Sequence, residues 1–290
     1  MNTEHLDSKL RFSILTPVHN GAEFVEELIV SVLRQDYEEF DHVIIDDGST
    51  DSEATVGILQ RYPHLRWKSQ ENIGQFATFN ELIKNATGDV LSIINADDLY
   101  PDTGVLSAVA KHFQKSPDIE VVIGRTGRLA RKAGKWYVFF PDLPYHLAKR
   151  LIRWNVGLQH CAIFVRRSLI EKNTLYFDPS YKMKGDWDWI IRLLAVAHHV
   201  VYTDEVFAYW RLHDQQSSKV CQSGESEARR LCSIHGTSYR FHRFASGIIN
   251  RWGTLCAASA MAAQLGPRIA FHAMVRHGRH FLGLQTEIHQ

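Results

Sequence analysis

Residues 42–51 read HVIIDDGSTD, and this stretch decides the expected fold. Positions 43–45 are apolar and β-branched, and the Asp, Gly, Ser and Thr residues that follow are typical of a turn after a buried strand. Upstream, residues 12–15 form another short β-prone run, which Pro17 ends. Between the two runs, apolar residues recur at helical spacing over 24–33. The pattern predicts one β-α-β unit.

The alternation of strand and helix continues beyond this unit. It predicts a helix over 52–62, a strand over 65–68, a helix over 76–85 and a strand over 89–94. Such alternation indicates an α/β fold with a Rossmann-like, mostly parallel sheet and helices on both faces. Ligands of these sheets bind beyond the carboxyl ends of the strands. Because residues 17–20, 46–51 and 95–98 all follow predicted strands, we expect these polar clusters to converge on one edge.

The pattern changes near residue 101. The second half is mixed, with a predicted β-ribbon and two later strands, over 121–124, 135–140, 161–165 and 206–212. After residue 217 the chain is rich in Ala, Arg and His with helical periodicity. We therefore expect one domain over 11–218, made of an alternating half (11–100) and a mixed half (101–218), and a helical C-terminal extension over 219–290.

Composition excludes several classes of protein. The 33 Lys and Arg residues against 32 Asp and Glu leave a formal charge of +1, so nothing indicates a nucleic-acid partner. The four cysteines form no C-x-x-C pair, which indicates free thiols in a reducing compartment; they are Cys161, Cys221, Cys232 and Cys256. Residues 1–11 lack an apolar signal core, and no run of roughly 20 apolar residues occurs. A cytoplasmic protein is predicted.

Asp97 and Asp98, in the run NADD at 95–98, are the sharpest chemical feature. Two adjacent carboxylates at the end of an apolar strand are costly unless a cation neutralises them. Mn²⁺ or Mg²⁺, bound by carboxylates and completed by diphosphate oxygens and water, would do so. The alternative is a turn in which an aspartate caps the next helix.

Asp46 and Asp47 admit a similar pair of interpretations. The cluster 46–51 can build a tight turn and then cap a helix. Alternatively, a carboxylate directly after the strand can accept hydrogen bonds from a base N–H or a ribose hydroxyl.

Residues 72–75 read NIGQ, and their spacing alone predicts a loop that enters a helix.

Two clusters in the second half could carry chemistry. Asp186 and Asp188 lie two residues apart where a helix is predicted, so they point apart: one could pair with Arg192 and the other face a cleft as a proton acceptor. The alternative is a helix cap beside core tryptophans.

Arg211 and His213 would share one face of an extended segment, where Arg could bind a phosphate and His a diphosphate or a metal ion. The alternative is a surface Arg and a loop His, and His160 is ambiguous for the same reason.

Together these segments resemble the inverting family 2 glycosyltransferases, which have the nucleotide-sugar-binding GT-A fold. The motifs that carry the resemblance are SILTPVHN at 13–20, IDDGSTD at 45–51, NIG at 72–74, Asn80, ATGD at 86–89 and NADD at 95–98. Their order and spacing fit over residues 11 to 106. A looser similarity continues through 160–168, 185–194 and 209–218, so the resemblance covers the chain up to residue 218. It implies that 11–218 is a GT-A catalytic domain, with 11–100 as the nucleotide-sugar half and 101–218 as the acceptor half.

The resemblance implies roles for the donor-side residues. Those expected to contact the nucleotide sugar are Pro17, His19, Asn20, Asp47, Asn72, Gly74, Asp97 and Arg211. Within this set, Pro17 and His19 would line the base pocket, although the family commonly has Tyr where His19 stands. Asp98 would be the direct ligand of Mn²⁺ or Mg²⁺, with Asp97 on the ribose or metal and His213 as a further ligand.

The resemblance also implies the acceptor side and the reaction. Asp186 matches the general base, although Gly185 precedes it where the family often has Glu, which leaves Asp188 as a second candidate. His160, Trp187 and Asp188 would contact the acceptor. The expected reaction is direct displacement with inversion, from a nucleoside-diphosphate sugar, with a UDP-sugar favoured, to a glycan or lipid-linked hydroxyl in surface polysaccharide or glycan synthesis.

Rival functions are weaker. A Rossmann oxidoreductase would have G-x-G-x-x-G after the first strand, whereas residues 16–21 read TPVHNG. An inactive nucleotide-sugar-binding protein of the same fold remains an alternative, because the motifs indicate binding more directly than turnover. The basic, apolar C-terminal region over 244–283 is either a helical cover or an amphipathic surface for peripheral contact with the inner face of an anionic membrane.

Overall fold

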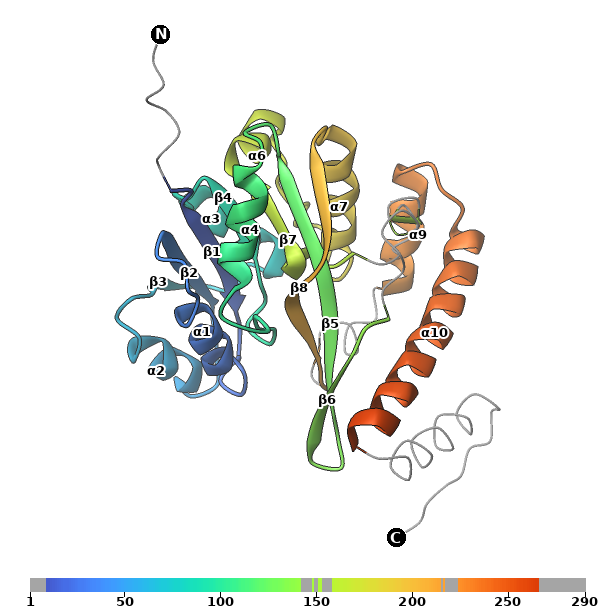
Figure 1. The fold of residues 1–290 in the computed structure, drawn as a ribbon, viewed down its shortest axis with the longest axis horizontal. Helices are drawn as coiled ribbons and strands as arrows, with labels where there is room; N and C mark the ends of the chain where they lie inside the picture. Colours follow the sequence, from blue (N-terminus) through green and yellow to red (C-terminus); the bar gives the residue numbers. More distant parts are fainter. Residues whose placement is uncertain are drawn as a thin grey trace.

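The computed structural model of this chain describes residues 9–141, 148, 151, 152, 158–214, 216 and 224–265 (Figure 1). One central sheet crosses the molecule, with helices on both of its faces (Figure 1). The described helices are α1 (Val25–Leu33), α2 (Ala54–Gln60), α3 (Gln75–Asn85), α4 (Val105–Gln114), α6 (Arg167–Asn173), α7 (Gly185–Val196), α9 (Gly224–Ile234) and α10 (Tyr239–Leu265). The predicted α/β class is confirmed.

The sheet combines a parallel half with a mixed half. Its described strands are β1 (Phe12–Val18), β2 (Phe40–Asp47), β3 (Arg66–Gln70), β4 (Val90–Ile93), β5 (Val121–Lys132), β6 (Lys135–Phe139), β7 (Ile163–Arg166) and β8 (Val200–Leu212). Their order is β3-β2-β1-β4-β7-β5-β6, and β8 pairs with β5. Strands β1 to β4 run parallel, whereas β7 is antiparallel to both β4 and β5.

The first half follows from the apolar runs. Every residue of β1 and all but the first residue of β2 are buried, because helices cover the sheet on both sides. Alternate side chains therefore enter different cores: Leu15 lies in the core on one face, and Phe12 and Ile14 lie in the core on the other. A strand buried on both faces has a continuous apolar run, which is why the sequence predicts this half well.

The second half differs from the prediction at several strand ends. Strand β5 extends to Lys132, and β8 begins at Val200 instead of 206. These two strands pair with each other from Val121 to Ala130, with register shifts near Arg125, and this pairing lengthens both beyond their apolar runs. Residues His160–Ala162 form a 3₁₀ turn, η2, so the strand predicted from 161 begins at Ile163.

The described part of the extension is helical. Helix α10 packs against β6, where the Gln264 side chain bonds the backbone N–H and carbonyl of Val138 at 3.1 and 2.7 Å. The predicted boundary at 218/219 falls outside the described residues, as do Cys221 and residues 266–290.

In the described ranges, no helix is long and apolar enough to cross a bilayer. Cys161 and Cys232 are buried free thiols.

Gly88 lets the backbone entering β4 lie directly against β1. A Cβ built on Gly88 would lie 2.5 Å from the backbone nitrogen of Ser13 and 2.6 Å from the carbonyl carbon of Phe12. The Gly88 N–H also donates to Ser13 Oγ at 2.9 Å. The α3 helix ends before this point, at Asn85, and Ala86 is its extended C-cap. Close approach between two strands therefore requires glycine here.

We expect Gly88→Ala to lower the free energy of unfolding by about 1–3 kcal/mol, because backbone atoms of β1 must move to admit the methyl group. Urea denaturation followed by circular dichroism measures this change. Gly57→Ala is the matched control: no atom lies within 4 Å of its added Cβ, and Gly57 lies in α2. Alanine there should be neutral or stabilising by up to about 1 kcal/mol. Equal stabilities of the two variants would contradict the close approach.

Candidate active site

A cavity of about 710 Å³ lies at the carboxyl ends of β1, β2 and β4. It is lined by residues at or just after the ends of these strands, by the loop after β3, by the first turn of α7 and by residues after β8. Its walls include Pro17, His19, Asn20, Glu23, Phe24, Asp47, Asn72, Gly74, Gln75, Asn95, Asp97, His160, Tyr181, Lys182, Met183, Asp186, Trp210, His213 and Gln216. The three polar clusters expected at one edge of the sheet therefore do converge there.

The residues after β1 and β2 are bonded to each other. Asn20 adopts a φ of 51°, and its N–H donates to Ser49 Oγ at 2.8 Å while its side-chain oxygen accepts from the Thr50 N–H at 2.7 Å. His19 Nδ1 lies 3.0 Å from the carbonyl oxygen of Asp47. Ser49 and Thr50 thus fix the conformation of Asn20, and the Asp47 carbonyl holds His19 at the cavity wall.

The Asp47 carboxylate organises the next loop. It accepts hydrogen bonds from the N–H groups of Ile73 and Gly74 and from the Gln70 side chain, each at 3.0 Å. Gly74 has a φ of +88°, which glycine adopts without strain, and α3 begins at the next residue. Asp47 therefore shapes the wall that contains Asn72 and Gly74, besides lining the cavity itself.

Asp97 and His213 form a polar pair on the opposite wall. His213 Nε2 lies 2.8 Å from Asp97 Oδ2, although 116 positions separate them in the sequence. In the described part of the chain, no group of three His, Cys, Asp or Glu side chains could hold a metal ion. Two protein ligands suffice for Mg²⁺ when substrate phosphates and water complete its coordination. A carboxylate and an imidazole that both line the cavity fit such a divalent ion.

Asp98 is placed differently from Asp97. It is 1% exposed and does not line the cavity, and its Oδ1 accepts from the Arg211 backbone N–H at 3.1 Å. Its Oδ2 is buried without a hydrogen-bond partner among the described residues. Burial, and then the charge of Asp97, raise the pKa of the Asp98 carboxyl well above its usual range. This geometry favours Asp97 over Asp98 as a cavity-side ligand.

Arg211 is also turned away from the cavity. Its guanidinium is 1% exposed, with Nε donating to the Asp97 carbonyl at 2.9 Å and an Nη donating to Glu27 at 2.6 Å. Its charged carbon lies 4.7 Å from the centre of the Phe24 ring. Through these contacts Arg211, near the end of β8, joins the turn after β4 to helix α1. They do not correspond to the direct diphosphate contact expected from the sequence.

Asp186 lies at the cavity on the first turn of α7. Its Oδ1 accepts from the Trp187 N–H at 2.8 Å, and its Oδ2 lies 3.7 Å from Nδ1 of His160, which also lines the cavity. Burial raises the pKa of the Asp186 carboxyl, but His160, Lys184 and the Trp187 N–H together outweigh it, so the pKa lies below its usual range. Asp186 is therefore ionised at neutral pH.

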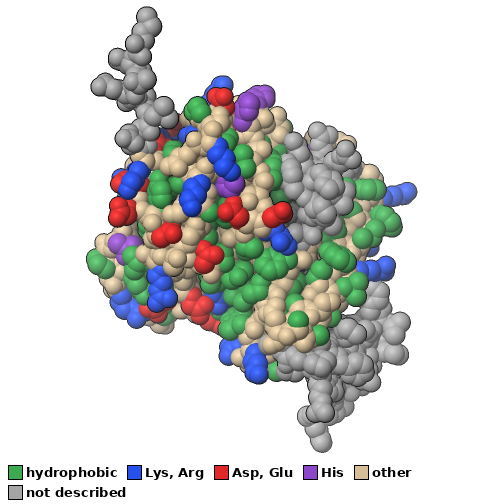
Figure 2. Space-filling view, in the orientation of Figure 1, with side chains coloured by type: hydrophobic (Ala, Val, Ile, Leu, Met, Phe, Trp, Pro, Cys, Tyr) green, Lys and Arg blue, Asp and Glu red, His purple; other side chains and the backbone are tan. Residues whose placement is uncertain are grey.

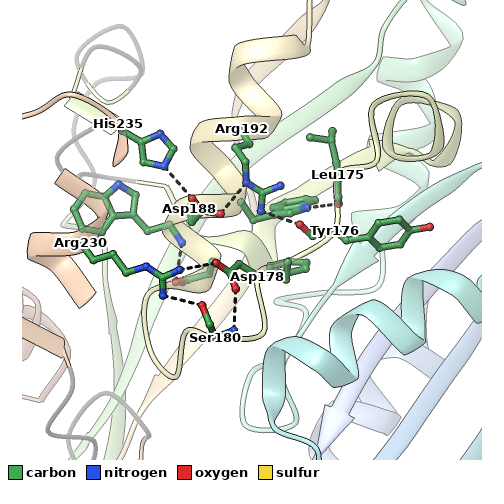
Figure 3. A network of polar contacts seen from close by, with 12 residues as sticks. Leu175, Tyr176, Asp178, Ser180, Asp188, Arg192, Arg230 and His235 are labelled. Carbon is green, nitrogen blue, oxygen red and sulfur yellow. Dashed lines mark hydrogen bonds and ion pairs between the residues drawn. The ribbon is translucent and has the colours of Figure 1, made fainter. Parts of the chain in front are cut away.

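Asp188 and Trp187 do not line the cavity. Figure 3 shows the Asp188 carboxylate pointing toward Arg192 and His235. Asp188 is 5% exposed and bonds Arg192 Nε at 2.7 Å and His235 Nε2 at 2.9 Å. Trp187 is 1% exposed, donates from Nε1 to the Ile152 carbonyl at 2.8 Å and stacks on His242. The pairing with Arg192 that the sequence allowed is present. Of the three residues expected to contact the acceptor, His160 lines the cavity, whereas Asp188 and Trp187 do not.

Several lining residues were not among the expected site residues. Gln75 bonds the Asn95 side chain at 3.1 Å, and its place in the NIGQ run offered a signal. Lys182 and Met183 line the cavity from the loop before α7. Nothing in their sequence marks them, because a loop held by distant segments carries no local pattern.

This sheet, with a cavity at its carboxyl edge, defines an α/β protein of the GT-A type. S. aureus TarS 1–349, solved in complex with UDP-GlcNAc, shares the fold with a TM-score of 0.64 and 22% identity, over 78% of this chain and 66% of that one. Mannosyltransferase PcManGT from Pyrobaculum calidifontis, solved with GDP-Man and Mn²⁺, gives a TM-score of 0.53 and 18% identity, over 94% and 76%.

The family model for glycosyl transferase family 2 matches residues 13–174, more than half of the chain. The chain belongs to this family. An uncharacterized glycosyltransferase of Rickettsia typhi is 28% identical over 225 residues, which are 76% of this chain and 70% of that relative. A Rickettsia bellii relative is 29% identical over 228 residues, but these are only 32% of its length, so the chain spans about a third of that protein.

The Asp186–His160 contact has a measurable consequence. We expect His160→Gln to raise the pKa of the Asp186 carboxyl, because the imidazole that favours the ionised form is lost while burial remains. Titration of the side-chain carboxyl carbon by NMR, assigned with Asp186→Asn, measures the pKa. His112→Gln removes a histidine that pairs with Glu205 and should leave this titration unchanged. An unchanged pKa in His160→Gln would contradict the assigned cause.

Proposed function

We propose that this family 2 glycosyltransferase moves a sugar from a nucleoside-diphosphate sugar, with a UDP-sugar favoured, to a hydroxyl acceptor with inversion. The observation that carries the proposal is one cavity lined both by the Asp97–His213 pair and by the Asp186 carboxylate. The UDP-GlcNAc complex of TarS and the complex of PcManGT with GDP-Man and Mn²⁺ support the donor class and the metal.

The donor would bind at the ends of β1 and β2. Six of the residues expected to contact the nucleotide sugar line the cavity there and in the loop after β3: Pro17, His19, Asn20, Asp47, Asn72 and Gly74. His19 would offer an imidazole face to the base. Because the Asp47 carboxylate already accepts three N–H bonds, we assign it mainly to holding the loop at 71–74 and secondarily to the ribose or base.

We assign the divalent ion, Mn²⁺ or Mg²⁺, to Asp97 and His213. When bound there it would neutralise the negative charge that develops on the departing diphosphate. This assignment reverses the order expected from the sequence, in which Asp98 was the primary ligand. Asp98 and Arg211 would instead hold Asp97 in position. The Arg211 side chain donates to the Asp97 carbonyl, and the Arg211 backbone N–H donates to the Asp98 carboxylate.

Asp186 would be the general base. As the acceptor oxygen forms a bond to the anomeric carbon, the bond from that carbon to the diphosphate oxygen breaks, and the acceptor proton moves to Asp186. The depressed pKa keeps this carboxylate ionised before the reaction. One displacement inverts the anomeric carbon. His160, Lys182 and Met183 would contact the acceptor, for which we propose a glycan or lipid-linked hydroxyl in surface polysaccharide or glycan synthesis.

Substitutions separate the metal, the base and the inactive-binder alternative. We expect Asp97→Ala and His213→Ala to weaken Mn²⁺-dependent UDP binding about tenfold or more, because each removes one of two protein ligands. Asp98→Asn keeps the side-chain shape and should bind UDP with Mn²⁺ like the wild type. Asp186→Asn should also bind UDP normally, while hydrolysis and transfer fall about 10²–10⁴-fold. Isothermal titration and product release from UDP- and GDP-sugars measure both properties.

The contrary outcomes are distinct. If Asp98→Asn loses Mn²⁺-dependent binding and Asp97→Ala retains it, the ligand order from the sequence is right and ours is wrong. Full turnover by Asp186→Asn removes the base assignment. A wild-type chain that binds UDP with Mn²⁺ but neither transfers nor hydrolyses any donor in the panel would favour the inactive-binder alternative.

Helix α10 suits peripheral contact with an anionic membrane. Apolar side chains recur along it at helical spacing and are 44–64% exposed: Phe241, Phe244, Ile248, Trp252 and Leu255. Arg240 and Arg243 are exposed on the same helix, and Figure 2 shows apolar and basic side chains together along that edge of the molecule. A basic helix with an exposed aromatic and aliphatic stripe has the composition of an interfacial helix.

We expect Phe244→Asp with Ile248→Asp to abolish flotation with vesicles that contain phosphatidylserine, since two charges replace the apolar stripe. Ile234→Asp is the matched control, because Ile234 is 57% exposed but lies at the end of α9. Flotation of the wild type and of Ile234→Asp, but not of the double variant, supports the contact. Equal flotation of all three, or a wild-type dimer by light scattering that the double variant loses, argues against a membrane.

A further inference from the structure

Glu227 on α9 bonds the loop that leads to Asp186. Its carboxylate accepts hydrogen bonds from three consecutive backbone N–H groups, those of Lys182, Met183 and Lys184, at 2.9, 3.0 and 2.9 Å. Glu227 is 7% exposed. One buried side chain from the C-terminal extension thus fixes the backbone of a loop whose residues line the cavity.

This carboxylate also lies next to the start of α7, where it adds to the negative charges of Asp186 and Asp188 in the first turn. Lys184 is the N-cap residue of α7 and makes no side-chain capping bond. A helix N-terminus presents unpaired N–H groups and a partial positive charge, and a lysine cannot satisfy either. Glu227 brings a negative charge to this end of the helix, two residues before Asp186.

Arg230 of α9 and His235 in the turn after it bond residues before and after Asp186. Figure 3 shows Arg230 pointing toward Asp178 and Ser180, and His235 toward Asp188. Before Asp186, Arg230 donates to Asp178 at 3.0 Å and to Ser180 at 2.7 Å, and its charged carbon lies 4.4 Å from the Tyr181 ring. After it, His235 bonds Asp188 at 2.9 Å. The loop before Asp186 and the first turn of α7 are therefore both bonded to the extension.

We propose that α9 completes the acceptor side of the active site, with Glu227 as the positioning residue for Asp186 and for the wall formed by Lys182 and Met183. This inference rests on the proposed function, in which Asp186 is the general base. Glu227 does not line the cavity and touches no reacting atom; it acts through the backbone at 182–184. The extension is then part of the transferase site and not only a cover.

The donor side does not depend on this contact. His19, Asp47 and Asp97 follow strands β1, β2 and β4, and their hydrogen bonds run to residues other than those of α9. Loss of Glu227 should therefore affect turnover and leave donor binding intact. A general loss of folded protein would instead lower the stoichiometry of donor binding, which separates a positioning role from a merely structural one.

The experiment compares the full chain with Glu227→Gln, Glu227→Asp and Glu225→Gln. The probes are UDP binding with Mn²⁺ by isothermal titration, hydrolysis of UDP-GlcNAc and hydrogen exchange of the amides at 182–184. Glu225 lies on the same helix and pairs with exposed Arg229, so Glu225→Gln is the matched control. For Glu227→Gln we expect kcat to fall about 10- to 100-fold, with KM and UDP stoichiometry unchanged and faster exchange at 182–184.

Glu227→Asp keeps the carboxylate on a side chain that is one methylene shorter. We therefore expect its kcat to lie between those of Glu227→Gln and the wild type. The proposal is wrong if Glu227→Gln keeps the wild-type kcat, if exchange at 182–184 is unchanged, or if UDP stoichiometry falls in proportion to the rate. Wild-type protein that binds no UDP and hydrolyses no donor would count against the proposed function instead. The exchange measurement would then still decide whether Glu227 holds the loop.

Discussion

The burial of Arg211 is the constraint on which the site depends. A guanidinium that is 1% exposed is costly unless its charge and N–H groups are matched, and here they reach the Asp97 carbonyl and Glu27. The Arg211 backbone N–H also bonds Asp98. These contacts join the end of β8 to the end of β4, and a bridge between Leu99 and Tyr209 adds to them. Asp97 and His213 meet only because the two strand ends are held together in this way.

The first half of the fold is predictable because its information is local. Strands β1, β2 and β4 are buried on both faces, so each contains a short run of mainly apolar residues, and a cluster of turn residues follows each one. The parallel arrangement then brings these clusters to one edge without any knowledge of side-chain contacts. Strands β5 and β8 are different, because their lengths come from pairing with each other. Local sequence contains little information about a partner strand so far along the chain.

The individual site roles are less predictable than the site itself. Asp97 and Asp98 are adjacent, and only the turn after β4 decides which carboxylate enters the cavity and which is buried against Arg211. Arg211 and His213 were expected to share a face, because alternate residues of a strand do. Strand β8, however, ends at Leu212, so His213 lies beyond the region where that rule applies. A strand end is therefore where sequence periodicity ceases to specify side-chain direction.

Helix α7 shows how one short segment can serve both structure and chemistry. Asp186 and Asp188 are two residues apart, so they leave the helix in different directions, as helical geometry requires. Asp188 meets Arg192 and His235 and is fully engaged in packing α7 against the extension. The outer oxygen of Asp186, Oδ2, lies 3.7 Å from His160 Nδ1, beyond hydrogen-bond distance, which leaves that oxygen able to accept a proton. The carboxylate that is suited to chemistry is the one left incompletely paired, and its neighbour's ion pairs hold the helix that positions it.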